Sequence, residues 1–236
     1  MTARRVSLVL FAALAVAGYL RTRQPILTWG ATPAEAAGPL PGDALLAAAD
    51  GISTRAIDID APPHDVWPWL AQMGPAPRGG AYTYDWIENL LGLDMHSVDN
   101  VLPEFQHPHV GDKIELGSNR MRLELVEPQR TLAWRSEDRN WVWTFVLADR
   151  AGRTRLISRN RFRLPSRAAR IGMLPMEPAS LVMERRMLRE IKRLSEGLAR
   201  GAPDRSGGER SQAAGQRTAR SPTRRYAPRA KRNPRP

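Results

Sequence analysis

The stretch from Glu177 to Arg200 constrains the fold more than any other part of this chain. Five apolar side chains recur there at spacings of four and three: Met183, Met187, Ile191, Leu194 and Leu198. This spacing lays one apolar stripe along a helix. Basic residues, with Glu184 and Glu190 among them, are expected on the opposite side. Since Pro178 in the first turn costs no hydrogen bond, the sequence predicts a helix of about six turns that lies against an apolar surface.

Segments with alternating apolar and polar residues predict that surface. Five strands are expected, at 112–116, 120–126, 131–136, 141–147 and 154–164. The short joints between them carry turn-forming residues, which implies hairpins and an antiparallel sheet. The expected inward-facing residues are Met121, Leu123, Leu125, Leu132, Trp134, Trp141, Trp143, Phe145, Leu147, Leu156, Phe162 and Leu164. The expected outward-facing arginines of the last strand are Arg155, Arg159, Arg161 and Arg163, and residues 166–176 are expected to form an irregular connection.

An earlier strand and two short helices complete the predicted order. Ile57 and Ile59 alternate with acidic residues, as in a half-buried strand. Helices are expected from Pro63 to about Met73 and over 84–91, the second one ending at Gly92. The expected fold class is therefore α+β, with a curved antiparallel sheet wrapped around a long C-terminal helix.

This order and several motifs resemble the SRPBCC superfamily, also called START-like or Bet v 1-like, which includes polyketide cyclase/dehydrase-related proteins. The resemblance rests on the segment 54–67, TRAIDIDAPPHDVW, on Gly111-Asp112, and on EPQRTL over 127–132. WGAT over 29–32 and GAYTYDWIENLLG over 80–92 are similar to actinobacterial members, of a membrane-anchored type. The resemblance implies a helix-grip fold with a ligand cavity. It implies no single function, because lipid carriers, hormone receptors and aromatase/cyclases share this fold.

The formal charge of +12 comes from the two ends of the chain. Residues 1–25 contain four arginines and no acid, and residues 201–236 contain ten Lys or Arg against two acids, whereas the middle holds as many acids as bases. We expect an N-terminal membrane anchor over 1–23, a linker over 24–51 and the helix-grip domain over 52–200. The tail over 201–236 has too few apolar residues to fold and is expected to be disordered. With no cysteine, the chain has neither disulfides nor a thiol nucleophile.

The apolar run from Val6 to Leu20 supports the anchor. Arginines flank both of its ends. Fifteen helical residues span about 22 Å, less than the roughly 30 Å of a hydrocarbon core. The alternative is a cleaved signal peptide with Ala15-Val-Ala17 as its processing site. Because that site lies inside the apolar run, we favour a single-pass anchor and leave the side of the membrane open. The basic tail is expected to attract anionic lipid, with nonspecific nucleic acid or a plain spacer as alternatives.

The predicted sheet and helix would enclose an apolar cavity. Its expected lining is Met121, Leu123, Trp134, Trp143, Phe145, Phe162, Met183 and Met187. The alternative is that these side chains simply fill a core. Thioethers adapt to irregular ligand shapes, which favours a cavity.

A second group of residues follows the Gly-rich loop at 74–80. Tyr82, Tyr84, Trp86 and His96 are expected to form a polar pocket mouth. Asp85 or Glu88 with His96 could serve as an acid/base set, although a capped helix and a satisfied histidine explain them more simply. Glu104, His107 and His109 have a metal-like spacing but lie in a proline-marked loop with no further ligand nearby. We therefore expect no catalytic residue, no metal and no cofactor.

Two functions remain open. The first, which we favour, is membrane-tethered binding of a hydrophobic small molecule such as a lipid, an isoprenoid or a polyketide-like compound. The second is a polyketide cyclase/dehydrase-like enzyme that uses the same cavity. An enzyme needs a polar pair that converges inside the cavity, whereas a carrier needs only apolar walls and a polar rim.

Overall fold

The computed structural model describes residues 17–19 and 21–201. Residues 17–19 and 21–27 are helical, followed by α2 (Pro33–Ala37) and the 3-10 turn η1 (Asp43–Leu46). Strand β1 (Gly51–Ile59) leads to α3 (Pro63–Ala71), α4 (Asp85–Leu90) and the 3-10 turn η2 (Pro103–Phe105). The remaining elements are β2 (Lys113–Leu116), β3 (Asn119–Glu127), β4 (Thr131–Ser136), β5 (Trp141–Asp149), β6 (Thr154–Phe162) and α5 (Arg167–Gly201).

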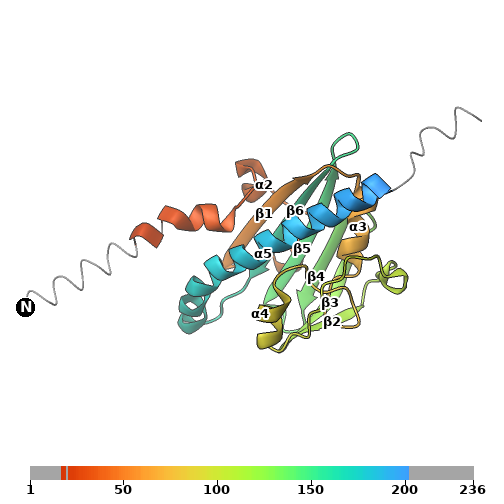
Figure 1. Ribbon diagram of the computed structural model, residues 1–236. Coiled ribbons are helices and arrows are strands. Elements are labelled where there is room, and N and C mark those ends of the chain that lie inside the picture. Colours follow the sequence, from red (N-terminus) through yellow and green to blue (C-terminus); the bar gives the residue numbers. More distant parts are fainter. Residues whose placement is uncertain (1–16, 20, 202–236) are drawn as a thin grey trace, which may run out of the picture. The chain divides into compact units, whose positions relative to one another are not determined.

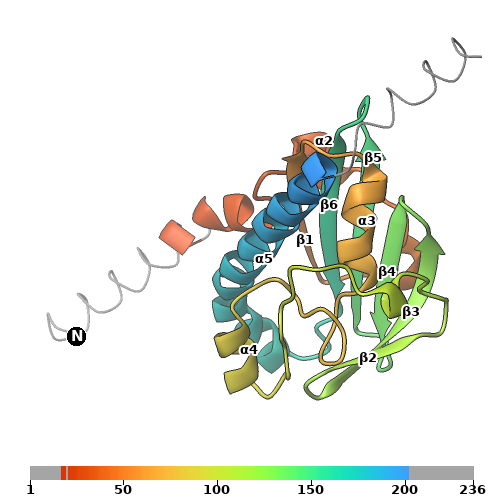
Figure 2. The ribbon, with the colours of Figure 1, turned by 45° about the vertical axis from the view of Figure 1, so that its right-hand side comes forward.

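The six strands form one antiparallel sheet in the order β1-β6-β5-β4-β3-β2. Helices α5 and α3 lie across one face of this sheet, and α2 lies behind it (Figures 1 and 2). We call the face under α5 the inner face and the opposite one the outer face. This arrangement confirms the predicted α+β helix-grip fold, in which the long C-terminal helix lies on a curved antiparallel sheet.

The inner face carries the hydrophobic core. Cross-strand pairing aligns Leu123 with Trp134, Trp134 with Trp143, and Leu132 with Phe145. These rows pack against the second half of α5 through Met187, which is buried in the same cluster. Because side chains in a strand alternate between faces, the period-two pattern correctly identified most of the inner face.

Leu125 is an exception to that pattern. The pairing register shifts between Leu123 and Leu125, so Leu125 pairs with Ala133 rather than with an inward-facing residue. Ala133 faces the turn at Gly42 on the outer side of the sheet. Such a bulge adds one residue to a strand and turns the following side chain to the other face. The prediction that Leu125 points inward was therefore wrong, and Val126 takes the inward position opposite Leu132.

Helix α5 begins ten residues earlier than expected. The prediction of an irregular connection over 166–176 was wrong, because the helix runs from Arg167 through both Pro175 and Pro178. A proline inside a helix frees the carbonyl four residues before it. For Pro178 that carbonyl belongs to Leu174, and it accepts a hydrogen bond of 3.3 Å from the Tyr19 hydroxyl. Tyr19, which is distant in sequence, thus replaces the backbone hydrogen bond that Pro178 cannot make.

The segment predicted to be a linker, 24–51, packs on the sheet. The backbone N–H of Ala56 in β1 donates to the Trp29 carbonyl, and the α2 residue Glu35 pairs with Arg155 of β6. Arg155, Arg159 and Arg161 do face outward, as predicted, yet this segment buries all three. The outer face is therefore covered where the sequence indicated only a row of charges.

The two ends of the chain fall mostly outside the described residues. This applies to the predicted anchor, of which only residues 17–19 and 21–23 are described, and to the predicted tail after Gly201. Within the described part of the chain, no helix is both long enough and apolar enough to cross a bilayer.

Candidate functional site

On the inner face we distinguish a filled half, where the side chains are almost fully buried, from an open half, where they are only partly buried. In the filled half, five of the predicted cavity residues are almost fully buried in the core: Met121, Leu123, Trp134, Phe145 and Met187. A side chain packed on every side by core neighbours leaves no room for a ligand. This half of the predicted lining lies in the core.

The other predicted lining residues lie at the open half. Trp143, Phe162 and Met183 are only partly buried, and Trp143 packs against the edge of the core. Trp141 joins them. Its ring stacks on Trp143 at 6.0 Å and 17°, and on Phe162 at 6.0 Å and 18°. Three aromatic rings therefore form a continuous row, which we call the aromatic row, beneath the first half of α5.

A buried polar cluster adjoins the aromatic row. Arg55 of β1 forms an ion pair with Glu184 of α5, and its guanidinium also donates to the Ser180 hydroxyl at 3.0 Å and to the Ile26 carbonyl at 3.2 Å. The Ser158 hydroxyl donates to the second oxygen of Glu184. Arg55 is 0% exposed and Glu184 7%. We call Arg55, Ser158, Asn160 and Glu184 the inner polar cluster.

The indole nitrogens connect the aromatic row to this cluster. Trp143 Nε1 donates to the Ser158 hydroxyl at 3.0 Å, and Trp141 Nε1 donates to Asn160 Oδ1 at 2.9 Å. Asn160 Nδ2 in turn lies 3.4 Å from Glu184 Oε1. Buried indole N–H groups usually require such partners. The hydrogen bonds fix the planes of both rings, so the aromatic row is a preorganised surface.

Burial dominates the electrostatics of the inner polar cluster. Loss of water raises the pKa of Glu184 above its ordinary value of 4.5, and the positive charge of Arg55 opposes this effect. An arginine does not lose its proton inside a protein. Arg55 therefore keeps its positive charge, and the carboxyl group of Glu184 is placed directly against it.

The sequence analysis missed the inner polar cluster. It placed Glu184 on the basic side of the helix, which was wrong, because Glu184 precedes Met187 by three positions and Ile191 by seven and so shares their buried face. Arg55 has the same parity as Ile57 and Ile59 in β1. A charge at an inward-facing position in each element was the signal that could have revealed the pair.

The predicted pocket mouth does not assemble around one opening. Tyr82 is buried in the core, where its hydroxyl accepts from Gln72 Nε2 at 3.0 Å, and burial raises the pKa of this hydroxyl. Tyr84 and Trp86 are exposed at α4. His96 lies at the surface with Asp94 at 3.0 Å.

The candidate acid/base set is separated in the same way. Asp85 accepts hydrogen bonds from the backbone N–H and hydroxyl of Ser97, which hold the loop after α4. Glu88 is buried, and burial raises its pKa. Over residues 17–19 and 21–201, no hydrogen bond joins His96 to either carboxylate. The same residues contain no group of three or more side chains placed to hold a metal ion.

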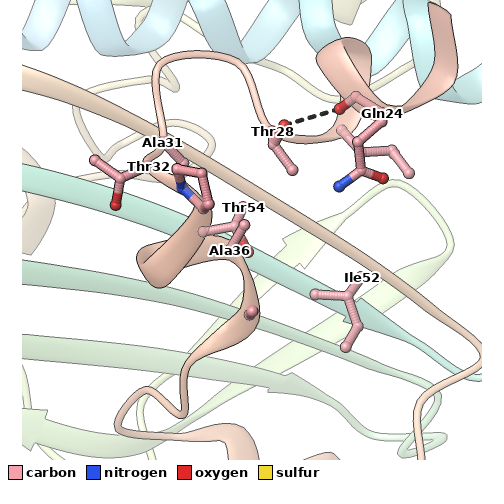
Figure 3. A pocket seen from close by; sticks show the side chains of 10 residues that line it. Gln24, Thr28, Ala31, Thr32, Ala36, Ile52 and Thr54 are labelled. Atoms are coloured by element: carbon pink, nitrogen blue, oxygen red, sulfur yellow. Dashed lines mark hydrogen bonds between the residues drawn. The ribbon is translucent and has the colours of Figure 1, made fainter.

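Two hollows lie on the outer face. The first, of about 570 Å³, lies between the N-terminal helical segment, α2 and β1 (Figure 3). Thr28, Thr32 and Thr54 line it together with Ile52, and the Thr28 hydroxyl donates to the Gln24 carbonyl at 2.9 Å. The second, of about 330 Å³, is lined by charged side chains of β2, β3 and β4 and of the loop after β4. Both differ from the inner face in having no aromatic wall.

Comparisons with known proteins concern the fold. No protein-family model matches the sequence, and no curated protein sequence matches it either. Among solved structures, the Polyketide_cyc-like protein Cgl2372 of Corynebacterium glutamicum is 14% identical, with a TM-score of 0.32 over 72% of this chain and 97% of that one. Protein MLL2253 of Mesorhizobium loti is 20% identical, with a TM-score of 0.34 over 64% of this chain and 100% of that one. A Rhodobacter sphaeroides protein is 18% identical, with a TM-score of 0.42 over 62% and 93%.

These likenesses are too distant to transfer a ligand or a reaction. The helix-grip architecture rests instead on the strand order and on the position of α5 in this chain.

Proposed function

We propose that this protein binds a hydrophobic small molecule between the aromatic row and the first half of α5. The observation that carries the proposal is the aromatic row itself. Its three rings face an element of the same chain and yet remain only partly buried. Flat apolar walls with a few convergent polar groups are the usual composition of a ligand site.

The chemistry of the site narrows the ligand class. Parallel aromatic rings favour a planar or ring-containing apolar body, as in a polyketide-like or isoprenoid compound, over a saturated acyl chain. Because Arg55 is paired with Glu184, the site has no spare charge for a carboxylate or phosphate. A hydroxyl or carbonyl on the ligand suits the hydrogen-bonding groups of Ser158 and Asn160.

The chain ends suggest how the protein is held at a membrane. We propose that residues 1–23 anchor the protein and that the basic tail from 201 to 236 adds affinity for anionic lipid. Support comes from the apolar run over 6–20 with its flanking arginines and from the excess of basic residues in the tail. The membrane side is left open.

A cyclase-like enzyme is the second candidate. The observation in its favour is that a carboxylate and a hydroxyl, those of Glu184 and Ser158, converge in the interior. Against it, Arg55 and Ser158 already occupy both oxygens of Glu184. Since neither oxygen of Glu184 is free to take a proton from a ligand, binding is the better supported function.

Native mass spectrometry of the full-length protein, released gently from membranes, tests the proposal. We expect a hydrophobic compound to remain bound. Met183→Arg should weaken the binding of this compound, or of a fluorescent hydrophobic probe, by about tenfold or more, because an unpaired charge would then lie at the site.

A matched control places the same charge outside the site. Val182 is the neighbouring residue on α5 and is 54% exposed, so Val182→Arg should leave probe binding unchanged. Met187→Arg should instead unfold the protein, since Met187 is buried in the core. Unchanged probe binding in a folded Met183→Arg variant would overturn the proposed site.

A further inference from the structure

Exposed apolar side chains gather on one part of the described surface. Large side chains of this kind occur on α4 and on the first half of α5: Trp86, Leu90, Leu91, Ile171, Leu174, Met176 and Val182. Trp86 is 70% exposed and Leu90 is 80% exposed. Met176 lies about 140° around α5 from Ile171, so we call the other six residues the α4–α5 patch. Large exposed apolar side chains that gather in one region often mark a surface with a partner.

The two parts of the patch lie side by side. The Arg186 guanidinium of α5 lies 5.9 Å from the ring centre of Tyr84, the residue that precedes α4. Figures 1 and 2 both show α4 beside the first half of α5. On α5, Ile171, Leu174 and Val182 are spaced by three and eight residues, which places them along one side of the helix.

The N-terminal segment reaches the domain at the same place. Tyr19 contacts Leu174 and Glu177, Arg23 pairs with Glu177 at 2.7 Å, and Trp29 lies under Arg185 at 5.3 Å. Residues 19 to 29 therefore run in the same direction as α5. Tyr19 consequently lies next to the first half of α5, and it belongs to the apolar run of 6–20.

The surroundings of the patch are basic. From Arg163 to Met176 the chain has three arginines and no acid, and residues 17–24 add Arg21 and Arg23. Arg163, Arg167, Arg170 and Arg21 are exposed. A second copy docked symmetrically on this face would bring arginines against arginines, which is unfavourable. Although Arg170 pairs with Asp50 and Asp94 is exposed after α4, exposed arginines next to apolar side chains of α5 match the interface of an anionic bilayer.

We propose that the α4–α5 patch rests on an anionic lipid bilayer. The domain then lies on the membrane with Trp86, Leu90 and Ile171 at the headgroup level, beside the place where the N-terminal segment enters it. This deepens the proposed function, on which it rests in one respect: the first half of α5 covers the aromatic row, so the bound molecule would exchange with the bilayer rather than with water.

The absence of cysteine makes a site-specific test simple. Leu90→Cys and Ile171→Cys, each in the full-length chain, would be labelled with an environment-sensitive fluorophore. Val110→Cys is the matched control, because Val110 is also apolar and 58% exposed but lies before β2, outside the patch. Each protein would be reconstituted in vesicles of phosphatidylcholine and phosphatidylserine that carry a quencher on the acyl chain.

We expect a blue shift and strong quenching at positions 90 and 171, and neither at position 110. Both signals should weaken when phosphatidylserine is replaced by phosphatidylcholine. A tether without docking would leave all three labels in water and would overturn the proposal, as would a signal that depends on the protein-to-lipid ratio and thus reports a second copy. Coverage by the N-terminal segment would give a blue shift without quenching, which also overturns it. Since no ligand is needed, this test can fail independently of the ligand-binding proposal.

Discussion

Two arginine–glutamate pairs hold opposite faces of the same sheet. On the inner face, Arg55 of β1 pairs with Glu184 of α5. On the outer face, Arg155 of β6 pairs with Glu35 of α2 at 2.8 Å. Both arginines are nearly inaccessible to solvent, and both pairs join residues more than a hundred positions apart.

Their carboxylates nevertheless shift in opposite directions. Hydrogen bonds from Arg155, with a further one from the backbone of Thr32, lower the pKa of Glu35 from 4.5 to about 2. Burial raises the pKa of Glu184 because desolvation there outweighs the attraction of Arg55. Both carboxylates have an arginine partner, so the partner does not determine the direction of the pKa shift. That direction depends on how much water each carboxylate retains.

The outer pair therefore holds residues 24–51 against the sheet. In the inner pair, burial of Glu184 offsets part of the attraction to Arg55. Arg159 and Arg161 extend the outer network to Asp43, and Arg159 also donates to carbonyls of α2 and of Gly38. The inner pair joins α5 to β1, and further hydrogen bonds link Arg55 to Ser180 and Ile26 and Ser158 to Glu184.

The largest expected effect is the loss of one inner partner. Arg55→Ala leaves Glu184 buried without its counter-charge, and we expect the free energy of unfolding to fall by about 3–5 kcal/mol in urea titrations. Replacing both partners, as in Arg55→Met with Glu184→Leu, should recover most of this loss, because no charge then remains buried. A double variant as unstable as the single one would contradict this account of the inner pair.

Removing the charge of the outer pair should lower the free energy of unfolding by less. Glu35→Gln keeps the size of the side chain but removes a charge that accepts hydrogen bonds from Arg155, and we expect a loss of about 1–2 kcal/mol. Proteolysis between residues 24 and 51 should become faster, because this segment loses a contact with β6. An effect as large as that of Arg55→Ala would remove the contrast between the two faces.

The smallest expected effect is on the pH dependence of stability, which should differ between the two glutamates. Since the pKa of Glu35 is lower in the folded state, its contribution to stability is present above pH 4.5 and is lost as the pH falls from 4.5 towards about 2. Glu184 has a raised pKa, so its contribution is full below pH 4.5 and is lost as the pH rises through the folded value. Glu35→Gln should flatten the acid limb of the stability curve, whereas Glu184→Gln should make it steeper. Identical curves for both variants would show that neither shift exists.

The candidate site was predictable in part. Of the residues expected to line a cavity, Trp143, Phe162 and Met183 are partly buried, whereas Met121 and Trp134 lie in the core. Alternation identifies the face on which a residue lies and says nothing about how closely that face is covered. How closely α5 covers the sheet depends on contacts between distant segments, and only the packed chain defines it.

The sequence by itself determined the local elements: the strands and their inner residues from period two, the buried stripe of α5 from period 3.6, and the basic character of both chain ends. Only the tertiary structure decided that Arg55 and Glu184 meet inside, that residues 24–51 cover the arginines of β6, that a bulge turns Leu125 outward, and that α5 starts at Arg167. Each of these outcomes depends on a contact between residues distant in sequence or on a shift of strand register. Periodicity records the neighbours of a residue along its own element, and it contains no information on which distant segment will pack against that element.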